Sequence, residues 1–274
     1  MLGKISSFSG PLSTVSKKTS VDVDAQAFIT AASITDATQK SAINQLVIDF
    51  KSYGIWTKMK AIYPFVGATS TTHKWNLKDP RDLDAAFRLV FSGGWTHTST
   101  GAKPNGINGY AETYLTSNTS LSLNSTHISY YSRTDATATE VEIGTTTGPN
   151  AFDTGSLIEL RTSTTTYFRV NSLPGASYIT YADGDSRAFY IANRTSSSVV
   201  NGWRNSLKVA TGLVSSNGRS TRTFWIGAFN SGGSPYYSTK ECAFATIGDG
   251  LTDTEATNFY AAVQAYQTTL SRQV

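Results

Sequence analysis

Residues 243–255 read AFATIGDGLTDTE and contain the signals of a strand, a turn and the start of a helix. Its first five residues form an apolar run of strand length, and Gly248-Asp249-Gly250 is a glycine-rich turn. Thr252 and Glu255 then have the spacing of a capping box, which starts a helix. The apolar positions of this helix are Ala256, Phe259, Tyr260, Val263 and Leu270. The sequence therefore predicts a buried last strand followed by a C-terminal helix of about 18 residues that packs on the strands.

Upstream of this stretch, from residue 56 to residue 247, the pattern is that of β-structure. Short apolar or alternating runs are separated by the turn signals Asn105-Gly106, Asn108-Gly109, Asp183-Gly184 and Asn217-Gly218. About a dozen short strands at this spacing are typical of an all-β sandwich and not of βαβ units. The expected strands are 87–91, 127–132, 140–143, 157–161, 167–170, 188–192 and 223–227. A short helix is expected after Asp79, with Pro80 in its first turn.

The N-terminal part has a different composition. Residues 1–34 are rich in Ser and Thr and are interpreted as an extended arm outside the core. A helix is predicted over residues 36–53, capped by Thr35 or Asp36 and ended by Gly54, with apolar residues at 43, 46, 47 and 50. This apolar side must pack on a sheet or on another subunit. We therefore divide the chain into residues 1–55, for attachment and oligomerisation, and an outward domain over residues 56–274.

The composition excludes several classes of protein. Only 15% of the 274 residues are charged, whereas 73 are Ser or Thr. A net charge of +4 without a dense Lys/Arg stripe does not favour nucleic-acid binding. The single cysteine, Cys242, lies in an apolar run and is expected to be buried, and the N-terminus has no apolar segment typical of a signal peptide. Without an apolar run of about 18 residues, no membrane insertion is expected.

Two groups of residues carry a family resemblance. Phe91-Ser92-Gly93-Gly94 followed by residues 105–111 (NGINGYA) is similar to the opening of a laminin G-like or concanavalin A-like jelly roll. Residues 225–230 (WIGAFN) and 243–255 resemble the late strands and terminal helix of that family. The resemblance covers roughly residues 60–270. It implies an all-β, concanavalin A-like jelly-roll sandwich with an N-terminal arm plus helix and a C-terminal helix.

A longer set of residues resembles virion proteins of tailed bacteriophages. These are residues 53–64 (YGIWTKMKAIYP), 73–80 (HKWNLKDP) and 267–274 (QTTLSRQV). The resemblance implies a structural protein on the particle surface, assembled in the host cytoplasm, of the head-decoration or head-fibre type. Its partners would be other capsid or tail proteins, bound through residues 1–55, and a homotrimer is the expected assembly. A tail-fibre receptor-binding protein and a carbohydrate-binding module of a secreted protein remain alternatives, and head and tail are not distinguished.

Catalysis and metal binding are not expected. Glu140 and Glu142 would share one face of a strand, but two solvent-facing carboxylates are the simpler interpretation. His73, His97 and His127 lie outside any nucleophile-elbow motif and are interpreted as structural. Asp183-Gly184-Asp185 superficially resembles a calcium loop, yet it lacks the distal glutamate of an EF-hand and is more typical of a hairpin turn. No catalytic residue and no cofactor is predicted, and a calcium ion near these two aspartates is left open.

Weak glycan binding is the best ligand hypothesis. Sugars bind where an aromatic ring meets the apolar face of the sugar and polar groups bond its hydroxyls. The candidate residues, which we expect at loop tips, are Trp203, Arg204, Asn205, Tyr236 and Tyr237. Asn201-Gly202 before the tryptophan has the composition of a turn, and of two adjacent tyrosines at least one should be exposed. Trp95 is a weaker candidate, for which packing on a sheet is favoured.

Overall fold

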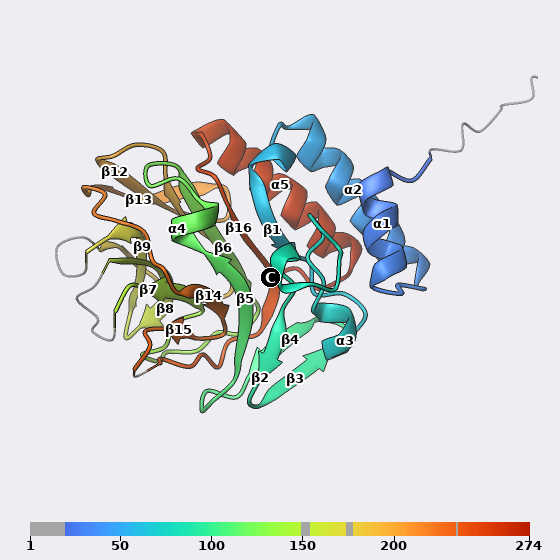
Figure 1. Cartoon of the computed structure of the whole chain (residues 1–274), viewed down its shortest axis with the longest axis horizontal. Helices are drawn as coiled ribbons and strands as arrows, with labels where there is room; N and C mark the ends of the chain where they lie inside the picture. Colours follow the sequence, from blue (N-terminus) through green and yellow to red (C-terminus); the bar gives the residue numbers. More distant parts are fainter. Residues whose placement is uncertain (1–19, 149–153, 174–177, 234) are drawn as a thin grey trace, which may run out of the picture.

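The computed structural model describes residues 20–148, 154–173, 178–233 and 235–274. Two eight-stranded sheets and a layer of helices make up the fold, with the long helices gathered on one side of the strands (Figure 1). The helices are α1 (Val23–Ala31), α2 (Ala37–Ser52), α3 (Ser70–His73), α4 (Ser117–Ser120) and α5 (Asp253–Thr269), with 3-10 turns at Trp56–Lys58 and Asp84–Ala86.

The first sheet, sheet A, adjoins the helices. Its strand order is β13 (Leu207–Leu213), β12 (Val199–Arg204), β11 (Ala188–Arg194), β6 (Thr126–Ser132), β16 (Cys242–Gly248), β4 (Gly101–Pro104) and β3 (Trp95–Thr98), and β1 (Met59–Tyr63) also pairs with β16. All of these pairings are antiparallel. The expected last strand, β16, is thus a central strand of this sheet.

The second sheet, sheet B, covers the other face of sheet A. Its order is β10 (Ile179–Ala182), β9 (Thr165–Ser172), β8 (Gly155–Thr162), β7 (Ile143–Thr146), β14 (Thr223–Ile226), β5 (Tyr110–Thr116) and β2 (Val90–Ser92). The short β15 (Phe229–Asn230) pairs with β7 in parallel, whereas the other pairings are antiparallel. The predicted concanavalin A-like jelly-roll sandwich is confirmed.

Strand alternation divides the interior into two apolar layers. On β11, Phe189 and Ile191 face the helices, whereas Ala188, Tyr190 and Ala192 face sheet B. The layer between the sheets also buries Cys242, as predicted, and its burial raises the pKa of the thiol. Sheet A is therefore covered on both faces, which explains why β6, β11 and β16 are buried along their whole lengths.

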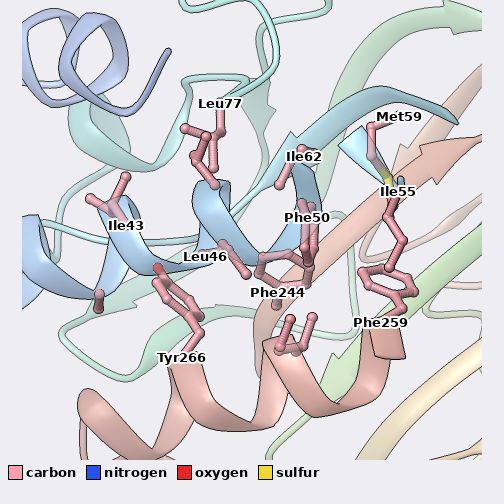
Figure 2. Close-up of a cluster of buried hydrophobic side chains, with 14 of the residues drawn as sticks. Ile43, Leu46, Phe50, Ile55, Met59, Ile62, Leu77, Phe244, Phe259 and Tyr266 are labelled. Carbon is pink, nitrogen blue, oxygen red and sulfur yellow. The ribbon is translucent and has the colours of Figure 1, made fainter. Parts of the chain in front are cut away.

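The helix layer forms one continuous core with sheet A (Figure 2). Phe259 of α5 makes edge-to-face ring contacts with Phe50 of α2 at 5.3 Å and with Phe189 of β11 at 5.0 Å. The predicted capping box is present, since the Thr252 and Glu255 side chains each bond the backbone N–H of the other residue. The C-terminal helix and its packing on the strands are thereby confirmed.

The interpretation of residues 1–34 as an arm outside the core is wrong for its last part. The chain forms α1 from Val23 and buries Phe28 and Ile29 against the rest of the helix layer. Asp22 caps this helix and makes an ion pair with Lys51 of α2 at 2.7 Å. The prediction failed because the segment has few large apolar residues, and those few are buried by contact with residues elsewhere in the chain. Residues 1–19 of the predicted arm lie outside the described residues.

The predicted helix over residues 36–53 is confirmed as α2, capped by Asp36. Its apolar side contacts α5 and sheet A of the same chain, so that Leu46 and Phe50 are buried without any second subunit. The need to bury this side was the physical reason for assigning oligomerisation to residues 1–55. The assignment of oligomerisation to residues 1–55 stays a prediction, but the burial of α2 within its own chain removes that reason for it.

Three local expectations are wrong. No helix follows Asp79, which instead bonds the Arg81 guanidinium, and the segment contains only the 3-10 turn Asp84–Ala86. The strand expected over residues 87–91 begins at Val90, because Phe87 adopts a left-handed conformation with φ of 59°. Residues 140–142 likewise precede β7 and are not part of a strand.

His127 makes folding stability depend on pH. Its ring is fully buried, its Nδ1–H donates to the Asp249 carbonyl at 2.6 Å, and its Nε2 lies 2.9 Å from the Thr246 hydroxyl. Burial lowers its pKa from 6.5 to about 4. Between these pH values the unfolded chain binds a proton that the folded chain does not, so stability falls as the pH decreases from 6.5 to 4.

We expect this histidine to contribute up to about 1.4 kcal/mol per pH unit to that decline. The measurement is the free energy of unfolding in urea at several pH values across this window, for the wild type and for His127→Gln. The variant should be less stable at neutral pH but should show a shallower slope. Equal slopes for the two proteins would contradict the assignment.

Candidate functional site

The outer face of sheet B carries a small cleft. By alternation, Ile158 and Leu160 of β8 face sheet A, so Leu157 and Glu159 point outward. The cleft holds about 150 Å³ and joins an apolar floor to an aromatic rim. Its lining residues are Thr139, Val141, Leu157, Glu159, Tyr178, Phe229 and Tyr236.

The floor is a separate apolar cluster outside the main core. Val141, Leu157 and Phe229 are buried together, and Tyr167 and Tyr178 pack against them. The two tyrosine rings meet edge to face at 5.7 Å. Gly144 on β7 makes this packing possible, since a Cβ there would lie 2.9 Å from Leu157 and from Phe229. The floor is therefore preformed by the strands themselves.

Arg169 of β9 lies beneath the rim and is fully buried. Its guanidinium carbon lies 5.2 Å from the ring centre of Tyr178 and 5.8 Å from that of Phe229, which are cation–π distances. Gly155 provides room for it, because a Cβ at that position would come within 2.9 Å of the guanidinium. These contacts stabilise the positions of the two rings, both of which line the cleft.

Polar groups at the cleft can bond a ligand. Glu159 is partly exposed, and one of its carboxylate oxygens accepts a hydrogen bond from the Thr162 hydroxyl at 2.5 Å. Burial raises the pKa of Glu159 and of Tyr178. Tyr236 is 44% exposed, the most accessible ring at this site. The cleft thus offers ring faces, a carboxylate and phenol hydroxyls within a small apolar space.

The structure places the two groups of predicted site residues on different sheets. Trp203 and its neighbours belong to β12 and the turn after it in sheet A, whereas Tyr236 borders the outer face of sheet B. Tyr236 is exposed, which confirms that one of the two adjacent tyrosines faces solvent, and Tyr237 is half-buried beside Ala228.

Trp203 does not lie at a loop tip, so the expectation is wrong. It is 3% exposed and belongs to the apolar cluster between sheet A and the helices. The preceding Gly202 is in the middle of β12, where a Cβ would lie 2.4 Å from the Phe168 ring. This glycine therefore serves close packing between the sheets, not a turn. The turn itself lies at Asn205, whose φ is 55°.

Arg204 and Asn205 are engaged in holding the backbone. The Arg204 guanidinium donates to the Asp185 carbonyl at 2.9 Å and lies 3.5 Å from the Asp183 carboxylate. The Asn205 side chain accepts a hydrogen bond from the backbone N–H of Phe189 at 3.0 Å. These contacts are those of a stabilised hairpin, and they do not present either side chain as an open binding group.

Asp183 and Asp185 lie in the connection from β10 of sheet B to β11 of sheet A. The Asp183 carboxylate accepts bonds from the Thr166 and Tyr190 hydroxyls at 2.9 and 2.6 Å, and Asp185 pairs with Arg187 at 2.8 Å. Within the described ranges, no cluster of three or more His, Cys, Asp or Glu side chains is placed to hold a metal ion. The hairpin expected here is wrong, because the strands on either side belong to different sheets and do not pair with each other. The expected capping of the backbone by the aspartate side chains is confirmed, since the backbone N–H groups of Asp185 and Arg187 donate to them.

Glu140 and Glu142 are not solvent-facing, and that interpretation is wrong. They are 2% and 0% exposed and pair with Lys240. The partner lies 100 residues away along the chain, so no local pattern could have indicated the pairing.

Two of the larger hollows have a lining that is less suited to binding a sugar. One, of about 530 Å³, is lined by Trp95, Lys103 and Asn105, and the Trp95 indole N–H is already bonded to the Ser92 carbonyl at 3.1 Å. The other, of about 320 Å³, lies between the start of α2 and the end of α5 and is lined mainly by small polar side chains. Neither brings several aromatic rings together with a carboxylate.

Sequence reasoning found Tyr236 but missed the rest of the cleft. The signal for Leu157 and Glu159 was available, because residues two apart on a strand share a face. Nothing local indicates that Tyr178 and Phe229 meet Arg169, since these residues come from three separate strands or loops.

Comparisons with known proteins identify the fold. No protein-family model matches the chain, and no curated protein does. A sialidase from Trypanosoma rangeli, solved with a difluoro-KDN ligand, superposes with a TM-score of 0.52 at 9% identity, over 81% of this chain and 39% of the sialidase. This chain thus spans about two fifths of that enzyme's length. The likeness shows a shared β-sandwich fold.

Domain 4 of AbnA, a GH43 extracellular arabinanase from Geobacillus stearothermophilus solved with arabinotriose, gives a TM-score of 0.47 at 12% identity, over 74% of this chain and 98% of that domain. No helix in the described part of the chain is long and apolar enough to cross a membrane.

Proposed function

We propose that this protein is a non-catalytic glycan-binding module whose ligand site is the cleft on the outer face of sheet B. The observation that carries the proposal is the grouping of Tyr178 and Tyr236 with Glu159 around an apolar floor. Ring faces bind the C–H side of a sugar, and the carboxylate and phenol groups bond its hydroxyls. This moves the ligand site from the predicted Trp203 region to the region of Tyr236.

The size of the cleft fits weak binding. A volume of about 150 Å³ accommodates part of a small sugar and buries little surface. A millimolar site contributes only about 4 kcal/mol. Display of many copies on one surface raises the avidity by orders of magnitude, so weak single sites suffice for adhesion.

The number of carboxylates at the cleft favours sugar binding over sugar hydrolysis. Glycosidases use two carboxylates about 5 to 10 Å apart on either side of the scissile bond. Among the described residues that line the cleft, Glu159 alone carries a carboxylate. The nearby Glu140 and Glu142 are buried and paired with Lys240, which removes them from contact with a ligand.

We expect the wild-type chain, presented multivalently on a glycan array, to bind at least one class of glycan. Tyr236→Ala should lower the signal on the same spots by about 10-fold or more, which corresponds to one lost ring contact of roughly 1.5 kcal/mol. Tyr53→Ala is the matched control, because Tyr53 is 40% exposed but follows α2 in the helix layer. An empty array, or equal loss of binding in both variants, would contradict the proposal.

We place this module on the surface of a tailed-phage particle, as a head decoration or head fibre that contacts other virion proteins through the N-terminal region. The support is the resemblance of residues 53–64, 73–80 and 267–274 to such proteins. Immunogold electron microscopy of intact particles tests this setting. Label on the particle surface is expected, and absence of the chain from purified particles would contradict it.

A further inference from the structure

A triad of buried charged side chains lies beside the cleft but does not line it. The Lys240 ammonium contacts the Glu140 Oε1 atom and lies 3.2 Å from the Glu142 Oε1 atom. The exposed fractions of these three side chains are 0%, 3% and 0%. Glu142 leads into β7 of sheet B, and Lys240 leads into β16 of sheet A. The triad therefore joins the two sheets.

The triad is expensive to keep ionised. Moving several charges from water into the interior costs free energy. The attraction between the charges offsets this cost only where their geometry is good. Burial raises the pKa of Glu142 to about 8, which suits this carboxyl to take up and release a proton near neutral pH. Burial lowers the pKa of Lys240, but attraction by Glu142 and Glu140 outweighs this effect and the pKa is raised overall. In the resting state an ammonium group is therefore paired with the Glu140 carboxylate.

We propose that Lys240 and Glu140 condense into an intramolecular amide, an isopeptide bond between the two sheets. One ammonium proton first moves to the Glu140 carboxylate, giving an amine and a carboxylic acid. The amine lone pair then forms the bond from Nζ to the Glu140 Cδ atom. Glu142 takes the proton that the nitrogen loses and delivers one to the departing Glu140 hydroxyl. The C–O bond breaks, water leaves, nothing is oxidised or reduced, and Glu142 ends as it began.

The surroundings of Glu140 suit this reaction. Its Oε2 atom accepts hydrogen bonds from the backbone N–H of Thr239 at 2.7 Å and from the Thr239 hydroxyl at 2.9 Å. Two donors aimed at one oxygen stabilise the negative charge that develops on it in the tetrahedral intermediate. The nucleophile is already held in contact with the carboxyl, which removes most of the entropic cost of a bimolecular step.

Glu142 is held in position to move protons. Its Oε2 atom accepts a hydrogen bond from the backbone N–H of Leu160 at 2.7 Å, and its Oε1 atom lies 3.3 Å from the Ser238 hydroxyl. These contacts keep Oε1 within reach of the lysine nitrogen. The product replaces a buried ammonium and carboxylate by one neutral amide, which lowers the desolvation cost of the site. A chain with a single cysteine would thereby gain a covalent link between its sheets.

The mass of the purified, denatured full-length chain tests the proposal. We expect the wild type to be about 18 Da lighter than its sequence requires, the mass of one water. Trypsin should fail to cleave after Lys240, and tandem mass spectrometry should find its peptide joined to the peptide that contains Glu140. Lys240→Arg, which keeps the positive charge, should have the full sequence mass.

Glu142→Gln should slow the loss of water by at least about 100-fold, as expected for removal of a proton-transfer group. A folded wild-type chain with the full sequence mass would overturn the proposal, whatever the variants do. Loss of water that maps to another place, such as Asp183-Gly184 or Asp249-Gly250, would overturn it as well. Bond formation at an unchanged rate in Glu142→Gln would overturn the role of Glu142.

Discussion

Replacing Phe259 by alanine is expected to lower the free energy of unfolding by about 3 to 4 kcal/mol. The ring is fully buried and makes edge-to-face contacts with Phe50, Phe189 and Phe244 at centroid distances of 5.3, 5.0 and 6.4 Å. These partners come from α2, β11 and β16, so the substitution leaves a cavity where three elements meet (Figure 2). Rigid neighbours on all sides cannot collapse into such a cavity, which places the cost high in the usual range.

Urea unfolding followed by circular dichroism measures this loss. Thr268→Ala is the control on the same helix, because Thr268 lies on the exposed side of α5. The control should change the free energy by no more than about 0.5 kcal/mol. An unchanged transition in Phe259→Ala would mean that α5 is not part of the folded core.

Replacing Arg272 by methionine is expected to cost about 3 kcal/mol or more, since several buried acceptors lose a charged donor at once. The guanidinium is 1% exposed and donates to the carbonyls of Pro64, Phe65 and Ala243 at 2.7, 2.7 and 2.9 Å. It also bonds the Gln267 side chain at 2.5 Å. Methionine fills part of the volume but satisfies none of these oxygens.

Thermal and urea unfolding of this variant should be compared with Arg81→Met. The Arg81 side chain is 62% exposed and pairs with its near neighbour Asp79, so its loss should be close to neutral. Equal stability of the two variants would show that the chain end does not hold the segment after β1 against β16.

Features that depend on neighbours in sequence could be predicted. The capping box at Thr252 and Glu255, the Asp36 cap and the apolar side of α5 each involve residues within two helical turns. The apolar runs of β6 and β11 could also be recognised, because a strand buried on both faces remains apolar over several residues. These signals were sufficient for the sandwich and for its terminal helix.

Features that depend on distant partners could not be predicted. Gly202 resembles a turn residue in sequence, yet the Phe168 ring that requires a glycine there belongs to another sheet. Glu140 and Glu142 resemble a solvent-facing pair until Lys240 is placed beside them. Tyr236 could be found because two adjacent residues near a strand point in opposite directions, whereas its companions in the cleft come from other strands.

The most direct test of the ligand site is an NMR titration of the tyrosine-labelled full-length chain with a glycan that binds on the array. If the ligand binds in the cleft, we expect the resonances of Tyr178 and Tyr236 to shift first, whereas the resonance of Tyr53 in the helix layer should stay unchanged. Tyr190, whose hydroxyl lies 3.3 Å from the Arg204 guanidinium, reports on the region around Trp203. Shifts confined to Tyr190, with Tyr178 and Tyr236 unmoved, would contradict the assignment of the cleft on sheet B.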